Sequence, residues 1–342
     1  MSALPTVRDQ SAAYSLLDLI QGAVITQAIS VAAKLGIADV LGDGPLTAAE
    51  IAGRVGSDPE ATHRLLRTLS GYSVFAVEPD GRFALTPMAG ALREDAPDSM
   101  RGMAVLMGHP LLWEEWGHLL TSVRTGEANL PKLRGMGAYD FLGANPEYAA
   151  VFFQGMGSIS ASETDPVLAA YDFSRFRTIV DVNGGRGGLL AGILAQAPGS
   201  RGVLVESEAA SADAASVFEA AGVAERVEIE NGSGFGKLPA GADAYVLKHV
   251  LHDFPEPECL TVLRNVRDAI APDGRLLLVE YVLDGGNERH IGNVIDLWLL
   301  HLLGAKERTL PQYTELFAKA GLKVTGVVPT TCPVSIVEAV PA

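Results

Sequence analysis

One segment, residues 177–206, constrains the fold more than any other part of the chain; it reads RTIVDVNGGRGGLLAGILAQAPGSRGVLVE. Residues 178–182 are mostly apolar and β-branched, as in a buried strand. Residues 183–188 contain four glycines, which let bare backbone approach a ligand closely. A helical apolar pattern follows and stops before Pro198, and residues 202–205 form the next strand. The segment therefore predicts strand, glycine turn, helix and strand, which is one half of an open α/β sheet.

Spacing within this turn separates two cofactors. A dinucleotide fingerprint requires a third glycine where the chain has Leu190, so NAD is disfavoured. Turns that bind S-adenosylmethionine carry an acidic residue followed by alternating glycines, and Asp181, Gly185 and Gly187 match that pattern. Asn183 occupies the first glycine position, and asparagine tolerates positive φ better than most residues. A tight turn that holds no ligand is the alternative.

Length, charge and cysteine content exclude several classes of protein. The chain has 342 residues, enough for two domains, and its hydrophobic content of 48% is ordinary for a soluble enzyme. Its formal net charge of −15 disfavours nucleic acid or an anionic membrane as a partner. Cys259 and Cys332 are the two cysteines, too few for a disulfide framework or a cysteine zinc site. The amino end lacks the pattern of a secretory signal, so we expect a cytoplasmic protein.

The first predicted helix, residues 11–34, is rich in Ala, Leu, Ile and Val on nearly all sides. Asp18, Gln21 and Gln27 interrupt it, so we interpret it as too polar for a membrane span and as a buried helix. An opening helix that is apolar all round more often packs into another subunit. The helix therefore predicts a homodimer.

A winged-helix pattern follows. Thr47 and Glu50 form a capping box, and Asp58 before Pro59 begins a second helix. Two short strands, at residues 74–77 and 82–85, are joined by a Pro-Asp-Gly turn. The second helix offers His63, Arg64 and Arg67 as its basic side chains, against an acidic background. DNA binding is thus the less favoured alternative to a role in dimerisation.

Residues 106–170 are helical in character and carry many aromatic side chains, among them Trp113 and Phe153. Most such aromatics pack against neighbouring helices, and a few line a ligand site. Phe153 and Met156 lie about one turn apart, so they share a helix face. Methionine suits an adaptable apolar pocket.

The α/β pattern continues with strands at residues 227–229, 244–247, 275–280, 323–328 and 333–339. In an open parallel sheet the ligand lies over the carboxyl ends of the strands. Glu206 ends its strand where a carboxylate can accept hydrogen bonds from ribose hydroxyls. The polar residues that should converge at these ends are Asp181, Glu206, Ser233, Lys248 and Glu280.

The second informative segment, KHVLHDF at residues 248–254, directly follows a strand. A histidine with a near-neutral pKa is the obvious general base, although a solvated or capping histidine is the alternative. His249 and His252 could share a helix face and hold a metal, but no third-ligand motif accompanies them, so we expect no metal. Glu280 and Glu307 could orient and stabilise an imidazolium, or could instead be surface salt-bridge partners.

Taken together, these segments resemble the S-adenosylmethionine-dependent small-molecule O-methyltransferases, which include plant caffeic-acid-type enzymes and bacterial enzymes that tailor polyketides and antibiotics. The resemblance spans nearly the whole chain through DVNGGRGG, LKHVLHDF, LLLVE and GAKERT. It implies a Rossmann-like methyltransferase domain with a mostly parallel seven-stranded sheet at residues 171–342. It also implies a mainly helical winged-helix dimerisation domain at residues 1–100 and a helical region at residues 101–170 that contributes to the substrate pocket.

The same resemblance assigns roles to individual residues. His252 would deprotonate a hydroxyl of an aromatic or polyketide-type natural product from secondary metabolism, and Glu280 and Glu307 would hold His252. The residues expected to bind the cofactor S-adenosylmethionine are Asp181, Asn183, Gly185, Gly187, Glu206, Ser233, Phe235 and Lys248. Those expected to border the acceptor are Trp113, Phe153, Met156, Asn293 and Asp296. The reaction would require no metal.

The chain departs from the family pattern in the donor site. Asn183 replaces a turn glycine, and Glu206 and Ser207 stand where the family usually has Asp and Leu. Residues 232–235 read Gly-Ser-Gly-Phe in place of Gly-Asp-Phe-Phe, so Ser233 replaces a carboxylate and could cost about 2 kcal/mol of cofactor affinity. The alternative function is therefore non-methyl chemistry on the same fold, such as hydroxylation, a pericyclic reaction or cyclisation.

Overall fold

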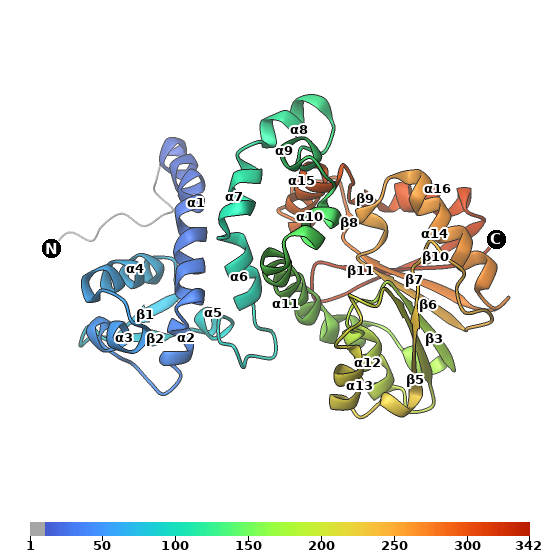
Figure 1. The fold of residues 1–342 in the computed structure, drawn as a ribbon, viewed down its shortest axis with the longest axis horizontal. Helices are drawn as coiled ribbons and strands as arrows, with labels where there is room; N and C mark the ends of the chain where they lie inside the picture. The colour runs from blue at the N-terminus through green and yellow to red at the C-terminus, as the bar shows by residue number, and fades with distance from the viewer. Residues whose placement is uncertain (1–10) are drawn as a thin grey trace. The chain divides into compact units, whose positions relative to one another are not determined.

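The computed structural model describes residues 11–342 (Figure 1). The chain divides into two compact units. One comprises the described residues up to Glu114 together with Asn145–Ile159, and the other comprises Glu115–Ala144 and Ser160–Ala342. Each unit has its own hydrophobic core, described separately below.

The first unit begins with the expected winged-helix pattern. Thr47 and Glu50 form a capping box at the start of α3, and the Asp58 side chain accepts from the Ala61 N–H at the start of α4. Strands β1 (Phe75–Val77) and β2 (Phe83–Leu85) pair antiparallel. The helices are α1 (Ala12–Lys34), α2 (Ile37–Val40), α3 (Ala48–Val55), α4 (Pro59–Gly71), α5 (Pro87–Gly90), α6 (Arg101–Met107) and α7 (Pro110–Trp116).

Helix α1 differs from the expectation of a buried helix. Its last two turns hold the buried Ser30, Ala32 and Ala33, but its first half is exposed, and Leu19 is 77% exposed. Within the described part of the chain, α1 is the one helix whose length and composition satisfy the usual requirement for crossing a membrane. The prediction that it is too polar for a span was therefore wrong. The predicted packing of this helix against another subunit stays a prediction, and its exposed first half is compatible with it.

The expected helical region between residues 106 and 170 is confirmed. It continues beyond α7 with α8 (Leu119–Thr125), α9 (Leu130–Arg134), α10 (Ala138–Ala144) and α11 (Pro146–Ala170). The 25-residue α11 contributes its beginning to the first unit and its end to the second. Its last turns pack Val167 and Leu168 into the core of the second unit.

The second unit is built on a seven-stranded sheet with the order β10-β11-β7-β6-β3-β4-β5. Strands β3 to β7 are parallel, and β10 and β11 are antiparallel additions at one edge. Their bounds are β3 (Thr178–Val182), β4 (Arg201–Glu206), β5 (Val227–Asn231), β6 (Ala244–Lys248), β7 (Arg275–Glu280), β10 (Leu322–Pro329) and β11 (Ser335–Pro341). This mostly parallel sheet confirms the predicted fold class.

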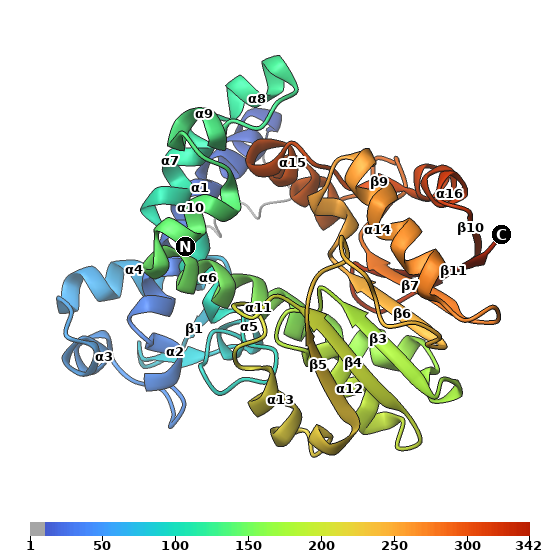
Figure 2. The same ribbon diagram turned by 45° about the vertical axis from the view of Figure 1, so that its right-hand side comes forward.

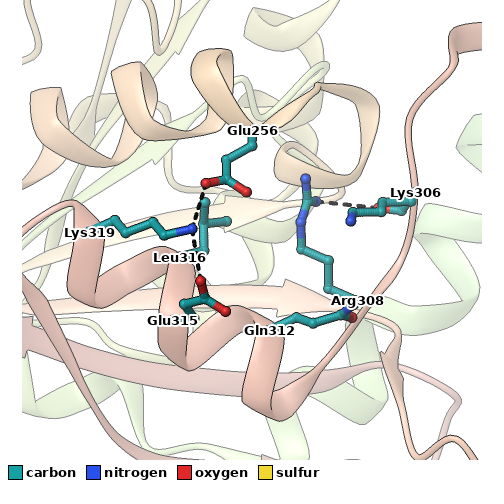
Figure 3. A pocket seen from close by; sticks show the side chains of 7 residues that line it. All are labelled: Glu256, Lys306, Arg308, Gln312, Glu315, Leu316 and Lys319. Atoms are coloured by element: carbon teal, nitrogen blue, oxygen red, sulfur yellow. Dashed lines mark hydrogen bonds and ion pairs between the residues drawn. The ribbon is translucent and has the colours of Figure 1, made fainter.

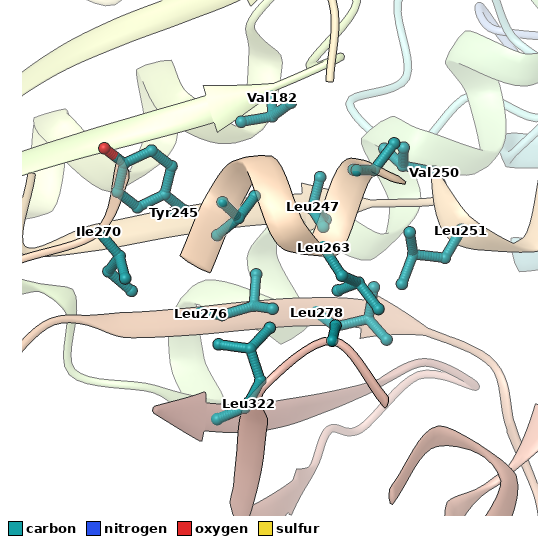
Figure 4. Close-up of a cluster of buried hydrophobic side chains, with 14 of the residues drawn as sticks. Val182, Tyr245, Leu247, Val250, Leu251, Leu263, Ile270, Leu276, Leu278 and Leu322 are labelled. Atoms are coloured by element: carbon teal, nitrogen blue, oxygen red, sulfur yellow. The ribbon is translucent and has the colours of Figure 1, made fainter. Parts of the chain in front are cut away.

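Helices lie on both sides of the sheet (Figure 2). On one face, apolar residues of α12 and α13 pack on Ile179 and Leu204. On the other face, residues of α14 and α16 pack around Leu247 and Leu278 (Figure 4). The remaining elements are η2 (Phe173–Arg175), α12 (Gly188–Gln196), α13 (Ala214–Ala220), η3 (Ala224–Arg226), η4 (Leu251–Asp253), α14 (Glu256–Ala269), β8 (Val282–Leu283), α15 (Ile291–Leu303), β9 (Arg308–Thr309) and α16 (Leu310–Lys319).

The strand order places polar residues where the sequence pattern predicted them. Strand β3 lies between β4 and β6, so the chain reverses its winding direction at β3. Ligands of open α/β sheets bind outside the carboxyl ends of the strands at such a reversal. Asp181, Glu206, Lys248 and Glu280 all lie at or next to these ends.

Candidate active site

The glycine turn after β3 keeps its shape despite its asparagine. Asn183 has φ of +56°, and Gly185 and Gly187 also have positive φ, so the prediction that asparagine would preserve the turn is confirmed. The Asn183 Oδ1 atom accepts a hydrogen bond from the Gly234 N–H at 2.7 Å. The substituted residue thereby ties the turn to the loop that carries Ser233.

Close packing around two glycines restricts the rest of the turn. A Cβ atom at Gly184 would lie 2.3 Å from the Asp181 carboxylate, and one at Gly187 would lie 2.4 Å from the Phe218 ring. Neither position can hold a larger residue without movement of a buried side chain. The turn is therefore rigid, and its bare backbone surrounds a carboxylate.

Asp181 is that carboxylate, and it has no hydrogen-bond partner within residues 11–342. Its side chain is buried, and both oxygens lack a partner. Burial, with a contribution from the Glu206 charge, raises the pKa of Asp181 to about 7, while Lys248 acts in the opposite direction. Buried polar groups normally have partners, so this pair of oxygens fits a cationic or hydrogen-bond-donating ligand.

Glu206 supports the turn from the neighbouring strand. Its Oε2 accepts from the Gly185 N–H at 2.9 Å and its Oε1 from the Ser207 N–H at 2.6 Å. Each carboxylate oxygen has a second lone pair, so Glu206 can also accept from ligand hydroxyls. Ser233 and Phe235 follow β5, and the Phe235 ring meets the Phe254 ring edge-on at 4.9 Å.

Lys248 has partners within the chain. Its ammonium group lies 3.0 Å from the Glu163 Oε2 and donates to the backbone carbonyl and hydroxyl oxygens of Ser160. Three partners match the three donors of an ammonium group. Its expected contact with the cofactor stays a prediction.

His252 lies in η4, where two glutamates approach one ring nitrogen. Its Nδ1 is 2.7 Å from the Glu307 Oε1 and 3.2 Å from the Glu280 Oε2. All three side chains are buried. The structure therefore brings together the three residues expected to be catalytic, and it excludes the alternative that both glutamates are surface salt-bridge partners.

These carboxylates set the protonation of His252. Burial disfavours the charged ring, but Glu280, Glu307 and Asp253 outweigh burial and raise the pKa of His252 to about 10. Burial likewise opposes ionisation of Glu280, yet the two neighbouring histidines hold its pKa below the ordinary value. The site is thus an ion pair in which the imidazolium Nδ1 faces Glu307 and Glu280, while Nε2 lies on the opposite side of the ring, 3.4 Å from the Asp253 Oδ1.

The backbone of η4 is fixed by the same glutamate. The Glu280 Oε1 accepts from the N–H groups of Val250, Leu251 and His252 at 3.1, 3.0 and 3.4 Å. Arg308 holds the other side of η4, because its guanidinium donates to the carbonyls of Leu251 and Phe254 at 3.0 and 3.2 Å.

Arg308 also borders a small hollow between α14 and α16 (Figure 3). Charged side chains line this hollow, and Lys319 bridges Glu256 and Glu315 there. These pairs are surface ion pairs, which contribute little to stability. Buried ionisable groups converge instead at the strand ends, so that region is the candidate active site.

Sequence reasoning missed several members of the site. Tyr139 donates to the Asp253 Oδ2 at 2.7 Å, and the Asp253 Oδ1 lies 3.4 Å from the His252 Nε2. Glu163, near the end of α11, is 2.8 Å from the His249 Nε2. Asp253 could have been found as the neighbour of His252, whereas Tyr139 and Glu163 lie on helices with no local pattern that indicates them.

The predicted acceptor residues fall in both units. Asp296 on α15 accepts from the Glu307 backbone N–H at 2.8 Å, so it helps to fix the backbone of a residue whose carboxylate contacts His252. Asn293 is exposed on the same helix. Trp113, on α7, and Phe153 and Met156, on α11, belong to the first unit, and their part in acceptor binding stays a prediction.

Comparisons with known proteins show which family the chain belongs to. A profile described as the O-methyltransferase domain matches residues 116–323, and one described as the O-methyltransferase dimerisation domain matches residues 17–95. The protein belongs to the family of S-adenosylmethionine-dependent O-methyltransferases. The second profile includes most of α1, the helix with the exposed apolar half.

Individual relatives extend over nearly the whole chain. The phenazine O-methyltransferase of Lysobacter antibioticus is 38% identical over 95% of both chains. An 8-amino-8-demethylriboflavin N,N-dimethyltransferase of Streptomyces davaonensis is 38% identical over 90% of this chain and 89% of its own. A calicheamicin-biosynthesis methyltransferase solved with S-adenosylhomocysteine has a TM-score of 0.88 at 33% identity, covering 98% of this chain and 100% of its own.

Proposed function

We propose that the protein transfers a methyl group from S-adenosylmethionine to a phenolic hydroxyl of a small aromatic natural product, with His252 as the general base. The observation that carries this proposal is the placement of His252 Nδ1 between Glu307 and Glu280, at 2.7 and 3.2 Å. This arrangement leaves Nε2 as the nitrogen that can take a proton.

The donor would be held by the turn between β3 and α12. When bound, S-adenosylmethionine supplies an electrophilic methyl carbon next to a positively charged sulfur. The unpartnered Asp181 carboxylate suits the positive charge of that donor. Glu206 would accept from the ribose hydroxyls, and Ser233 and Phe235 would border the adenine.

Proton transfer to His252 suits a phenol. The pKa of His252 is about 10, which equals that of an ordinary phenol. In the neutral form of His252, Nε2 can therefore take a phenolic proton at little cost in free energy, and Glu280 and Glu307 stabilise the imidazolium that forms. Positioning of donor and acceptor would supply about 7–11 kcal/mol and general-base catalysis about 10²–10⁴ in rate, so positioning contributes more. This chemistry needs no metal.

The first unit would provide the dimer contact. Its exposed apolar residues on α1 include Leu16, Leu19 and Ile20, and the dimerisation profile covers them. A second copy of the chain would bury this surface. Nucleic acid and membrane are not expected as partners.

Calorimetric titration with S-adenosylmethionine tests the donor site. We expect micromolar binding, weakened at least about tenfold by Asp181→Asn, because that variant removes the charge that faces the ligand. Asp268→Asn, which neutralises an exposed carboxylate on α14, should bind like the wild type. Absence of binding at millimolar donor would reject methyl transfer.

The mass of the product then identifies the chemistry. A phenol that gains one methyl group supports the proposal, and methylation of an amine in preference to every phenol tried would place the chain beside its N-methylating relatives. A product without the methyl mass increase would favour hydroxylation, cyclisation or a pericyclic reaction on the same fold.

A further inference from the structure

His249 lies three residues before the proposed base, and one of its two ring nitrogens has no hydrogen-bond partner among the described residues. The residue adopts φ of +53°, an unusual conformation for a side chain of this size. Its Nδ1 is buried without a hydrogen-bond partner within the described chain. That nitrogen faces the Glu280 Oε2 at 3.6 Å.

The opposite nitrogen of His249 is firmly held. Its Nε2 lies 2.8 Å from the Glu163 Oε2, and the Tyr281 hydroxyl donates to the Glu163 Oε1 at 2.9 Å. Lys248 lies 3.0 Å from the same carboxylate. Histidines that bind metals almost always donate their other ring N–H to a carboxylate, carbonyl or water. His249 already has this arrangement, with Nδ1 as the free position.

Two further ligand atoms converge on that position. The His252 Nδ1 lies 3.2 Å from the Glu280 Oε2, and one ligand atom from each of His249, His252 and Glu280 can be chosen so that all lie within 4.8 Å of one another. Metal–ligand bonds of about 2.0–2.1 Å in tetrahedral geometry separate neighbouring ligands by about 3.3 Å. The two separations that involve Glu280, 3.2 and 3.6 Å, bracket that value.

Glu307 can complete the coordination. Its Oε1 touches the same nitrogen of His252 at 2.7 Å, and its Oε2 is buried without a hydrogen-bond partner in residues 11–342. Two imidazoles and carboxylate oxygens form a ligand set that suits zinc and copper. The carboxylates of Glu163, Glu280, Glu307 and Asp253 make the surroundings favourable for a divalent cation.

We propose that His249, His252 and Glu280 form an inhibitory binding site for a divalent transition-metal ion of the zinc class, with Glu307 as the fourth ligand. Metal binding at Nδ1 displaces the proton of that nitrogen to solvent and leaves the remaining ring proton on Nε2. His252 in that state cannot take a proton from an acceptor. The metal would therefore stop turnover. This inhibition rests on the proposed function, whereas the binding of the metal is independent of it.

Cobalt(II) titration of the chelator-treated full-length protein, with neither donor nor acceptor present, tests the site directly. We expect one cobalt ion per chain, the visible absorption bands of a low-coordinate nitrogen–oxygen site, and displacement of those bands by zinc. Glu163→Gln should weaken binding about 10- to 100-fold, because it removes the negative charge that contacts the other ring nitrogen of His249. His249→Asn should weaken it more, and asparagine suits the positive φ of that residue.

His118→Asn is the matched control, because His118 is an exposed histidine on the N-terminal side of α8. It should bind cobalt like the wild type. Thermal unfolding of every variant shows whether the fold is retained. If the protein takes up no cobalt at millimolar concentration, or if folded His249→Asn and Glu163→Gln bind it as tightly as the wild type, the metal site is rejected.

Methyl transfer provides the second measurement. Zinc should lower the turnover of the wild type, and each variant is compared with its own zinc-free rate. At the same zinc concentration, the fold decrease in turnover should be at least tenfold smaller for a folded His249→Asn enzyme than for the wild type. Equal inhibition of both would reject the inhibitory role, and cobalt binding without any methyl transfer would reject the proposed function but leave the metal site standing.

Discussion

Asp181 and His252 are both buried and ionisable, yet their surroundings act on them differently. Asp181 has no hydrogen-bond partner, and burial raises its pKa to about 7. His252 has two glutamates on one nitrogen, which raise its pKa to about 10 despite burial. Both Asp181 oxygens thus remain able to accept hydrogen bonds, whereas His252 is held in one orientation by Glu280 and Glu307.

Replacement of His252, the proposed general base, should slow the reaction without abolishing it. We expect His252→Ala to lower methylation of an ordinary phenol by about 10²–10⁴, the usual contribution of a general base. A phenol acidic enough to ionise in solution should lose much less. Initial rates with both acceptors measure this difference. Complete loss with the acidic phenol, while calorimetry shows intact donor binding, would contradict the prediction.

Because the pKa of His252 is raised, a rise in pH should increase the reaction rate but decrease the contribution of His252 to the free energy of unfolding. The fraction of His252 in the neutral form, the form proposed to accept the proton, increases about tenfold per pH unit below pH 10. The rate with an ordinary phenol should therefore rise with pH across the neutral range. The folded pKa lies above the ordinary value of 6.5. The stabilising contribution of His252 is therefore complete below pH 6.5 and is lost as the pH rises towards 10.

A pH–rate profile and thermal unfolding at the same pH values measure these two effects. The free energy of unfolding of His252→Asn should depend less on pH than that of the wild type between pH 6.5 and 10. A rate that is flat with an ordinary phenol from pH 6 to 9 would show that proton transfer to His252 does not limit turnover.

Among the elements, the turn after β3 shows how a local substitution can be accommodated. Asn183 adopts positive φ and binds the Gly234 N–H. Asn183→Ala should lower the free energy of unfolding by about 1–2 kcal/mol for the left-handed backbone, plus about 1 kcal/mol for the lost hydrogen bond. Asn183→Gly should lose only the second contribution.

Denaturant unfolding and donor calorimetry of these two variants separate backbone strain from the hydrogen bond. Both variants lose the connection to the loop of Ser233, so both should bind the donor more weakly than the wild type. Equal stabilities of the alanine and glycine variants would show that positive φ at residue 183 carries no cost.

The elements of the second unit follow closely from the sequence, because short apolar runs bounded by turns predict buried parallel strands. The convergence of Asp181, Glu206 and Glu280 followed from the strand ends alone. Glu163 could not be predicted, since its role depends on where the end of α11 packs. The covering of α1 could be predicted only in part, because composition shows that the helix is apolar and does not show which molecule packs against its exposed first half.

Considered as a whole molecule, the protein exposes an apolar half-helix that a second copy can cover. We expect Leu19→Glu to shift a dimer towards monomers, because it places a charge within the apolar surface of α1. Gln21→Glu adds the same charge at an exposed polar position of the same helix and should remain dimeric. Light scattering after size exclusion, over a range of concentrations, measures the change. A monomeric wild type would contradict the prediction.

Glu280 uses its two carboxylate oxygens differently. Oε1 accepts from three backbone N–H groups, and Oε2 faces the two histidines. Substitution at position 280, in an effort to change the acceptor, would therefore alter both the backbone of η4 and the environment of His252, the proposed base. Libraries are better directed to solvent-facing positions such as Asn293, where altered specificity need not disturb the proton acceptor.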